Sequence, residues 1–312
     1  AEGAGAGLPI VRMYAAPGDD RPSLDAMFAA SPPVLPPCPA EPPDPAVILY
    51  TSGTTSDPKG VVLTHANLAG ERDSAFATVH VSEQDAVLGV LPLFHSLAQM
   101  ANLLLPFAVG ARVVYLETLN TTDLMKAFAE RRITIFACVP QFFYLIHQRV
   151  TGEVAKGGWA TRTIFKSLLA LNLRLRALGV NIGPKVFGRV HKVLGGHMRL
   201  LITGGSKFDP AIGRDLYALG FTIQQAYGLT ETSGAATLNR PEEAHIDTVG
   251  RILPGNELKI MPPEGDAEDG EIAIRGPIVM QGYYNRPDAN AEVFRDGWFL
   301  TGDLGRLDAE GR

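Results

Sequence analysis

Two short apolar runs near the start of the chain flank a polar stretch. The runs are "AVILY" at 46–50 and "GVVLTH" at 60–65, and the residues between them are mainly Thr, Ser, Gly, Asp and Pro. Runs of this length, rich in β-branched side chains and bounded by turn residues, are typical of β-strands. The pattern therefore predicts a hairpin whose turn is the polar stretch.

Downstream of this hairpin, apolar runs of strand length alternate with segments of helical period. Strands are predicted within 85–94, 111–116, 133–140, 198–205 and 221–228, and helices near 96–108 and at 121–132 and 209–220. The helix over 121–132 has threonine and aspartate at its start, and either could cap it. Strands that alternate with helices predict an α/β fold, with layered parallel sheets and flanking helices.

The pattern changes after residue 246. Short strands between Gly, Pro and Asp turns are predicted within 248–261, 270–284 and 297–308. They indicate a small antiparallel, barrel-like subdomain. We therefore expect three parts: a Pro-rich connector with the remnant of a first subdomain at 1–45, an α/β nucleotide- and acyl-binding core at 46–245, and the β-rich subdomain at 246–312.

Composition restricts the function classes. The chain has 312 residues, 46% of them hydrophobic, and a formal net charge of −5, so no overall basic field favours nucleic acid as a partner. With only Cys38 and Cys138, no disulfide framework is expected, which favours a reduced, cytoplasmic setting. The N-terminus lacks the pattern of a secretory signal. The most apolar span, 97–111, is too short and too interrupted to cross a bilayer.

The polar turn of the predicted hairpin is suited to phosphate. In "YTSGTTSDPKGVVLTH" (50–65), hydroxyls and flexible backbone N–H groups can surround phosphate oxygens, and Lys59 adds a positive charge. It is not a Walker A loop, because Lys59 precedes Gly60 and a strand follows. The alternative is an ordinary polar turn, since the same residue types are common in turns.

The whole stretch resembles the phosphate-binding loop of the adenylate-forming superfamily, which includes acyl-CoA synthetases, luciferases and the adenylation domains of peptide synthetases. Further segments follow in the order of that superfamily, and the resemblance covers roughly 46–312. These segments are "PLFHS" (92–96), "ITGG" (202–205), "QAYGLTET" (225–232), "GEIAIRGP" (270–277) and "WFLTGD" (298–303). The loop and "YGLTET" are specific signatures, whereas "PLFHS" and "TGD" are weak when taken alone.

The resemblance implies a reaction. ATP and a carboxylate give an acyl-adenylate and pyrophosphate, and a thiol such as that of CoA then takes the acyl group. The substrates and cofactors implied are ATP, Mg²⁺, CoA and a fatty acid. The loop would hold the β- and γ-phosphates through Thr51, Ser52, Gly53, Thr54, Thr55 and Lys59.

The other motifs supply the rest of the implied nucleotide site. Tyr227 would lie against adenine, with Gly228 allowing close backbone approach; Thr230 would bond the α-phosphate. Glu231 would help to hold Mg²⁺, which prefers oxygen ligands, and Asp303 would accept the ribose hydroxyls. Viewed singly, each could instead be a structural or solvated residue. Nucleotide binding is also assigned to Gly204 and Gly205, and catalysis to Thr230, Glu231, Lys59 and His95.

His95 narrows the predicted substrate. Amino-acid-activating members of the superfamily have an aspartate where "LFHS" lies here, and an imidazole cannot replace that carboxylate as the partner of an ammonium group. Amino acids are therefore not expected as substrates. In acyl- and aryl-activating members the corresponding histidine lines or gates the acyl pocket. The alternative is a histidine satisfied within the core.

The segment 154–208 is free of acidic residues and rich in Lys and Arg. It resembles the helical elaboration of long-chain fatty acyl-CoA synthetases. Its leucines and cations would suit peripheral contact with the inner face of a membrane, or with the phosphates of CoA. A solvated basic helix face that packs through its leucines is an equal alternative.

We therefore predict an AMP-forming fatty acyl-CoA synthetase for medium or long chains, an acid-thiol ligase. The alternatives are another acyl or aryl ligase that loads a carrier protein, and a non-catalytic nucleotide-binding module. The superfamily's mobile C-terminal domain, which supplies a lysine to the adenylation step, is not expected within 1–312. For this reason we expect the chain to bind nucleotide but to turn over slowly. The sequence does not predict the oligomeric state.

Overall fold

The computed structural model describes residues 39–51, 57–116, 120–240, 246–262 and 268–312. The chain divides into two units, Ala1–Glu41 and Pro42–Arg312, and the second contains every helix and strand described below. The predicted connector at 1–45 lies almost wholly outside the described residues. Ser52, Gly53, Thr54 and Thr55 of the predicted phosphate loop also lie outside them.

The predicted hairpin is confirmed. β1 (Pro45–Thr51) pairs antiparallel with β2 (Lys59–Thr64), so that Thr51 faces Lys59 at the loop end. A two-residue strand, β12 (Gly282–Tyr283), pairs with the other edge of β2 and completes a three-stranded sheet. The loop end of the hairpin is thereby attached to a segment more than 200 residues away in sequence.

α2 (His65–Phe76) follows β2 directly. The helix starts with a capping box, in which the Thr64 hydroxyl accepts from the Asn67 N–H and the Asn67 side chain accepts from the Thr64 N–H. The Asn67 amide also donates to the carbonyls of Pro277 and Val279, at 2.8 Å each. Asn67, in the first turn of α2, therefore also holds the chain that leads into β12.

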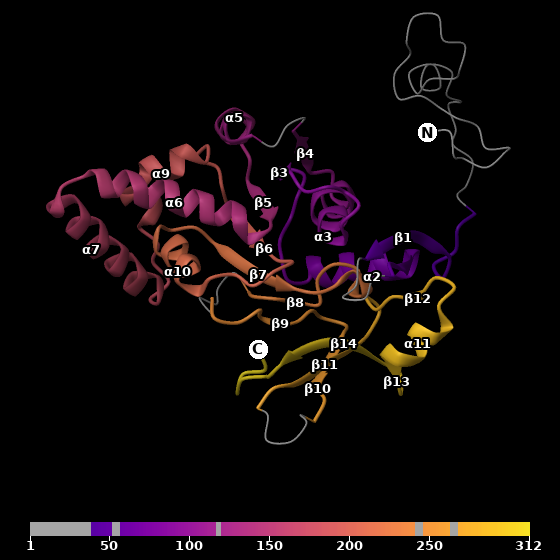
Figure 1. The fold of residues 1–312 in the computed structure, drawn as a ribbon. Coiled ribbons are helices and arrows are strands. Elements are labelled where there is room, and N and C mark those ends of the chain that lie inside the picture. The colour runs from indigo at the N-terminus through magenta and orange to yellow at the C-terminus, as the bar shows by residue number, and fades with distance from the viewer. Residues whose placement is uncertain (1–38, 52–56, 117–119, 241–245, 263–267) are drawn as a thin grey trace, which may run out of the picture. The chain divides into compact units, whose positions relative to one another are not determined.

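The largest sheet has seven strands in the order β4-β3-β5-β6-β7-β8-β9 (Figure 1). The pairs from β4 to β7 are parallel, and β8 and β9 add antiparallel strands at one edge. The prediction of a largely parallel α/β sheet is confirmed. Its strands are β3 (Ala86–Gly89), β4 (Arg112–Tyr115), β5 (Ile135–Cys138), β6 (Leu200–Thr203), β7 (Ile223–Tyr227), β8 (Thr237–Leu238) and β9 (Arg251–Ile252).

Successive side chains of these strands point to opposite faces of the sheet. Phe136 and Leu201 belong to the main core, with Phe128 and Phe143 from the helices of the first face. Those helices are α5 (Thr121–Arg131), α6 (Pro140–Lys156), α7 (Trp159–Arg176), α8 (Gly183–Val186), α9 (Gly188–Val193) and α10 (Pro210–Ala218).

The second face of the sheet packs against a different set of elements. Val87, Ile135 and Leu200 form a separate core with Val79, which follows α2. The helical segment predicted near 96–108 is continuous but changes its hydrogen-bonding pattern along its length. It consists of α3 (Ser96–Gln99), the π-helix η1 (Met100–Leu104) and α4 (Leu105–Ala108).

The prediction that threonine or aspartate caps α5 is wrong. Its N-cap is Asn120, one residue before the predicted start, and the Asn120 side chain accepts from the Asp123 N–H at 2.8 Å. Asparagine in extended backbone is as good a cap as serine or aspartate. The helix therefore begins where the chain provides the first suitable side-chain oxygen.

The C-terminal strands form a four-stranded antiparallel sheet in the order β10-β11-β14-β13, with β10 and β13 at its edges. The antiparallel character predicted after residue 246 is confirmed. β9 and β12, however, join the two sheets of the preceding part, so their pairing crosses the predicted domain boundary at 246. The elements not yet given are η2 (Thr230–Thr232), β10 (Glu257–Ile260), β11 (Gly270–Arg275), α11 (Pro287–Val293), β13 (Phe294–Arg295) and β14 (Trp298–Gly305).

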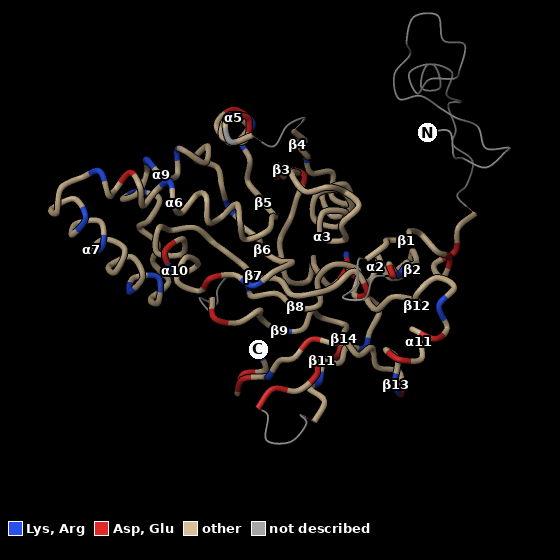
Figure 2. Tube along the Cα trace, viewed as in Figure 1, with Lys and Arg blue, Asp and Glu red and all other residues tan. Residues whose placement is uncertain are grey.

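Charge is unevenly distributed over these elements. Figure 2 shows Lys and Arg along α7 and α9, whereas Asp and Glu are frequent around β10, β11 and α11. Within the described part of the chain, no helix is long and apolar enough to span a bilayer.

Candidate active site

Lys59 is the first residue of β2, at the loop end of the hairpin. Its ammonium nitrogen lies 5.0 Å from the centre of the Tyr283 ring, a cation–π contact. The two residues meet because β12 pairs with β2 and aligns Tyr283 with Val61, two positions from Lys59 on the same strand. The predicted phosphate-binding lysine is therefore held at a defined place next to β12.

Tyr283 also contacts the predicted metal ligand. Its hydroxyl donates to Oε1 of Glu231 at 2.9 Å, and both side chains are buried. Burial raises the pKa of Tyr283, and the nearby carboxylate charge of Glu231 raises it further, so the hydroxyl stays a donor. Tyr283 thus joins Lys59 to Glu231, and the sequence prediction did not include it.

Glu231 lies in η2, a short 3₁₀ turn that follows β7. The Thr232 hydroxyl accepts from the Leu229 N–H at 2.9 Å and holds this turn closed, while the Met280 N–H donates to the Glu231 carbonyl at 2.8 Å. Thr230 is half-buried in the same turn, directly beside Glu231. Hydrogen bonds within the turn and from Met280 therefore hold the backbone of Thr230 and Glu231 in place.

Gly228 lets another part of the backbone, residues 234–236, pack closely against it. A Cβ atom at this position would lie 2.4 Å from the Gly234 carbonyl oxygen and 2.8 Å from the Ala235 Cα atom. The backbone around Gly228 thus packs against 234–236 without room for a side chain. The expected role for Gly228, close approach to adenine, remains a prediction.

Tyr227 and Asp303 meet in the structure although 76 residues separate them. The Tyr227 hydroxyl donates to Oδ2 of Asp303 at 2.8 Å, and the Asp303 N–H donates to the Thr301 hydroxyl at 3.1 Å. Burial raises the pKa of Tyr227, with a smaller contribution from the Asp303 carboxylate. Asp303 itself is exposed, so its second oxygen is open to a ligand.

The glycine pair of "ITGG" follows β6. A Cβ atom at Gly204 would lie 3.1 Å from the Ala226 carbonyl oxygen, which places this residue against β7 just before Tyr227. Gly205 has φ +78°, a left-handed conformation that favours glycine. The structure therefore places Gly204 next to the Tyr227 segment, and the expected binding of nucleotide by Gly204 and Gly205 stays a prediction.

His95 does not have the environment of a core histidine, and its expected role in gating an acyl pocket stays a prediction. The residue is exposed at the start of α3, and its ring lies 4.4 Å from the ring of Phe94. It is therefore not a satisfied core histidine. It also does not line the pocket described next, whereas Leu97, two residues later, does.

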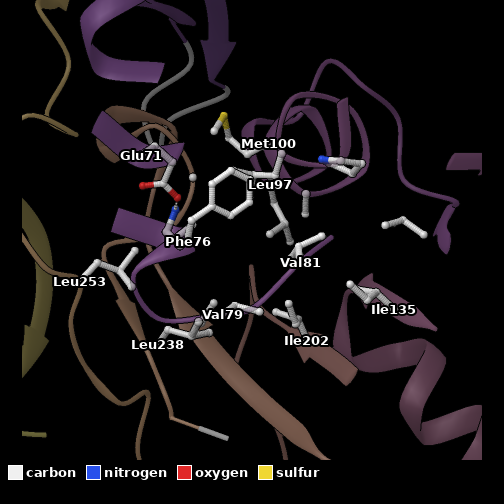
Figure 3. A pocket seen from close by; sticks show the side chains of 18 residues that line it. Glu71, Phe76, Val79, Val81, Leu97, Met100, Ile135, Ile202, Leu238 and Leu253 are labelled. Carbon is white, nitrogen blue, oxygen red and sulfur yellow. Dashed lines mark hydrogen bonds between the residues drawn. The ribbon is translucent and has the colours of Figure 1, made fainter. Parts of the chain in front are cut away.

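An apolar pocket of about 80 Å³ lies on the second face of the seven-stranded sheet. Its floor is formed by alternate residues of the strands, among them Val87, Ile135 and Ile202. Its sides come from α2 and from the α3–η1–α4 segment, which contribute Phe76 and Met100 (Figure 3). An apolar lining of this kind suits hydrocarbon, and a volume of about 80 Å³ has room for a short segment of a chain.

The pocket borders the predicted nucleotide site directly. Gly234 and Ala235 line it, and they follow η2 after a single residue, Ser233. A Cβ atom at Gly234 would lie 3.7 Å from the Ser96 carbonyl, so the residue after His95 is also adjacent. The arrangement places an apolar pocket beside the segment that holds Thr230 and Glu231.

Magnesium is compatible with these residues. Among the described residues, no cluster of three or more His, Cys, Asp or Glu side chains could hold a metal ion without other ligands. Mg²⁺ usually binds through one or two carboxylates together with substrate phosphates and water. Glu231, a single buried carboxylate beside Thr230 and near Lys59, fits this mode.

Comparison with known proteins agrees with this geometry. Residues 8–284 match the family described as "AMP-binding enzyme". A long-chain-fatty-acid–CoA ligase, FadD15, from Mycobacterium bovis is 33% identical over 281 residues, covering 86% of this chain and 45% of that protein. Long chain acyl-CoA synthetase 1 from Arabidopsis thaliana is 34% identical, covering 83% of this chain and 42% of that protein.

Solved structures give the same result. The N-terminal domain of FACL13 from Mycobacterium tuberculosis has a TM-score of 0.71 and 26% identity, covering 93% of this chain and 65% of that chain. o-Succinylbenzoate CoA synthetase from Bacillus subtilis, solved with its acyl-adenylate intermediate, has a TM-score of 0.67 and 27% identity over 87% of this chain and 49% of that chain. The fold is that of the adenylate-forming enzymes.

The chain belongs to the AMP-binding enzyme family. It spans about half the length of the curated relatives it matches. The resemblance to fatty-acid–CoA ligases predicted from the sequence is therefore confirmed at the level of the family.

Proposed function

We propose that this chain activates a fatty acid of medium or long chain to an acyl-adenylate, with ATP and Mg²⁺, for transfer to CoA. The observation that supports this most is the position of the apolar pocket beside Thr230 and Glu231. An acyl chain in the pocket would present its carboxylate to the α-phosphate of ATP bound at the adjoining turn. The names of the relatives, which are fatty-acid–CoA ligases, favour the same substrate class.

The residues have separate roles in this proposal. A carboxylate oxygen of the fatty acid attacks the α-phosphorus of ATP, a new P–O bond forms, and the bond to pyrophosphate breaks. Lys59 would hold the leaving pyrophosphate, and the Thr230 hydroxyl would bond the α-phosphate. Mg²⁺ held by Glu231 would neutralise charge on the phosphates. Tyr283 would keep Glu231 in place through the bond observed here.

Tyr227 and Asp303 would position the nucleoside. One Asp303 oxygen already accepts from the Tyr227 hydroxyl, and the other is free to accept from a ribose hydroxyl. A carboxylate accepts several hydrogen bonds at once, so both contacts can coexist. The Tyr227 ring, fixed by its own hydroxyl, would then lie beside the base.

The test is ATP–pyrophosphate exchange with acetate, benzoate, octanoate and palmitate. Exchange should be fastest with octanoate or palmitate. The Ala101→Phe variant, which fills the pocket, should lose palmitate exchange more than acetate exchange, whereas Ala108→Phe on the exposed side of α4 should behave like the wild type. Equal effects of Ala101→Phe on all acids would contradict the assignment of the pocket.

The thiol acceptor needs a second assay. Thioester formation should be detected with CoA and palmitate, and no carrier protein should be required. Formation of thioester only on a phosphopantetheinyl protein would favour a carrier-loading ligase. Both assays are run on this chain and on a version extended through the C-terminal domain of the superfamily, because the expected slow turnover of residues 1–312 alone would hide exchange. Tight ATP binding without exchange for any acid in the extended version would favour the non-catalytic module.

A further inference from the structure

A second cavity lies among the helices of the first face of the sheet, whereas the apolar pocket described above lies on the second face. Its volume is about 260 Å³, against about 80 Å³ for that pocket. α6, α7 and α10 line it and contact one another (Figure 1). We call this cavity the α6–α7 groove. None of the described residues that line it belongs to the candidate active site.

The α6–α7 groove has an apolar wall. Phe165 and Leu169, one turn apart on α7, are half-buried and pack against the main core, and Val154 of α6 lines the same space. The Phe165 ring lies 5.5 Å from the ring of Phe187, a contact that holds it in the wall. Such a wall suits hydrocarbon.

Two cations distinguish the groove from the pocket beside the active site. That pocket is lined by apolar residues, glycine and proline, apart from the buried Glu71 of α2. The groove has Arg162 and Lys166 at its rim, one turn apart and both exposed. The Arg162 guanidinium donates to the Ala155 carbonyl at 2.6 Å, and neither cation forms an ion pair with a described residue. Their charges are therefore available to a ligand.

The acid of the groove lies toward its opposite end. Asp215 of α10 bonds Nε2 of His147 at 2.8 Å, so a protein group already partners it. α10 is joined to α7 by the hydrogen bond from the Asn172 amide to the Ala218 carbonyl, at 2.8 Å. Ala218 follows Asp215 by about one turn, and Asn172 is about 15 Å along α7 from Arg162. The groove therefore has a positive end, an apolar middle and its acid at a distance from the cations.

We propose that the α6–α7 groove binds a fatty acid of medium chain length, with its carboxylate at Arg162 and Lys166 and its hydrocarbon along Phe165 and Leu169. A guanidinium group matches a carboxylate in geometry, and the ammonium group adds a second positive charge. The volume lies just below the range of about 300–1,000 Å³ that is usual for drug-sized ligands, which fits a medium chain.

The groove is an accessory site. A molecule bound in it is separated by the sheet from the pocket beside Thr230, so it is not the acid that would be activated there. The inference therefore goes beyond the proposed function and does not depend on it.

A basic helix face exposed only to solvent explains less of this arrangement. Such a face needs cations but no hollow of about 260 Å³ beside them. It also gives no reason for the Arg162 side chain to turn back toward α6, where it bonds the Ala155 carbonyl and flanks the hollow.

The experiment locates a bound fatty acid directly. The probe is decanoate with a photoreactive diazirine at its methyl end, irradiated in the presence of the chain, and adducts are mapped by mass spectrometry after digestion. We expect adducts within 151–169 whose yield saturates with probe concentration. Adducts around Ala101, in the pocket beside the active site, are counted separately.

Two variants test the groove itself. Ala155→Trp fills it, and Lys166→Glu reverses a charge at its rim. Each should lower the apparent affinity for adducts within 151–169 about tenfold and leave adducts around Ala101 unchanged. The matched controls are Ala160→Trp and Arg174→Glu, exposed on α7 and outside the groove, which should behave like the wild type. Loss of groove adducts in the controls as well would overturn the inference.

Competition tests the chemistry of the ligand without any variant. Unlabelled decanoate should displace the probe from the groove, whereas methyl decanoate, which has no charge, and acetate, which has no chain, should not at the same concentration. Equal displacement by the methyl ester would overturn the inference, as would adducts found only around Ala101 or spread over 154–208 regardless of Ala155→Trp. Failure of the proposed function appears separately, as absence of pyrophosphate exchange while the groove adducts persist.

Discussion

Tyr283 holds two predicted site residues with the two parts of one side chain. Its ring lies under the Lys59 ammonium group, and its hydroxyl donates to Glu231. Lys59 and Glu231 could be predicted from the sequence because both lie in recognisable motifs. Tyr283 lies outside those motifs, and only the pairing of β12 with β2 shows its position. The sequence signal that could have indicated it was an aromatic pair in a predicted strand, which is common in structural roles.

The Tyr283→Phe variant tests this link. It keeps the ring beneath Lys59 but leaves Glu231 Oε1 without its donor, so we expect a loss of about 1 kcal/mol in unfolding free energy. Mg²⁺-dependent ATP binding should weaken several-fold, because Glu231 would no longer be held in one orientation. Calorimetric titration and urea unfolding measure the two effects. Tyr284→Phe, at the neighbouring exposed position, should change neither.

Glu71 should give the folded state a distinctive dependence on pH. Its pKa is raised from 4.5 to about 8, so between these values the folded state keeps a proton that the unfolded state has released. The contribution of Glu71 to stability is therefore complete below pH 4.5 and is lost as the pH rises to about 8.

The measurement is the difference in unfolding free energy between wild type and Glu71→Gln across that range. The difference should change by about 1 kcal/mol per pH unit, to the disadvantage of the wild type at higher pH. Taking the difference cancels the other titrating groups. A flat difference would show that Glu71 is ionised in the folded protein. Glu83→Gln should follow the wild type at every pH.

At the scale of elements, the apolar pattern predicted most of the α/β part. The hairpin, the parallel strands from β3 to β7 and the helices α5 and α10 follow from local period and turn residues. The pairing of β9 and β12 could not be predicted in this way. Each has only two residues, and the partner of each is chosen by packing far along the chain rather than by a pattern within it.

The candidate site was predictable to a similar extent. The residues with chemistry in the motifs, such as Tyr227 and Asp303, are indeed neighbours. The pocket was not predictable, because its floor consists of alternate residues from strands that are distant in sequence. Glu71 was not predicted either, since a glutamate in an otherwise mixed helix has the pattern of a surface residue.

Gly228 and Gly152 offer a matched comparison of the same substitution in two elements. Gly228→Ala places a Cβ atom 2.4 Å from the Gly234 carbonyl oxygen, so the turn after β7 must shift. We expect a loss of about 1–3 kcal/mol in stability and weaker ATP binding.

Gly152→Ala meets no atom within 4 Å on the exposed side of α6, and alanine favours the helix. This variant should gain up to about 1 kcal/mol without change in ATP binding. Thermal unfolding and nucleotide titration of both variants provide the test. Similar stability for the two variants would mean that the 228–236 packing is less tight than observed.

At the scale of the whole molecule, the basic segment 154–208 presents cations and an aromatic ring at the surface. α7 has Lys166 and Arg174 exposed, and Trp159 at its start is 81% exposed. Contact of this segment with an anionic membrane surface stays a prediction. The alternatives are contact with the phosphates of CoA and a basic helix face exposed only to solvent.

Flotation with anionic liposomes at low salt tests the membrane hypothesis. Lys166→Glu should reduce binding about tenfold, because it removes one positive charge and adds a negative one near the lipid. Lys126→Glu makes the same charge change on α5 and should have less effect. A chain that ignores such liposomes would remove the membrane hypothesis.

The pairing of β12 with β2 has a consequence for biosynthesis. The ribosome releases β2 long before it has made Tyr283 and Asp303, so a nascent chain has the hairpin without its third strand. Contacts with such large sequence separation form late and slowly. The candidate nucleotide site is therefore complete only when synthesis has passed residue 303. Until β12 has been made, the exposed edge of β2 is open to other strands, including those of neighbouring nascent chains.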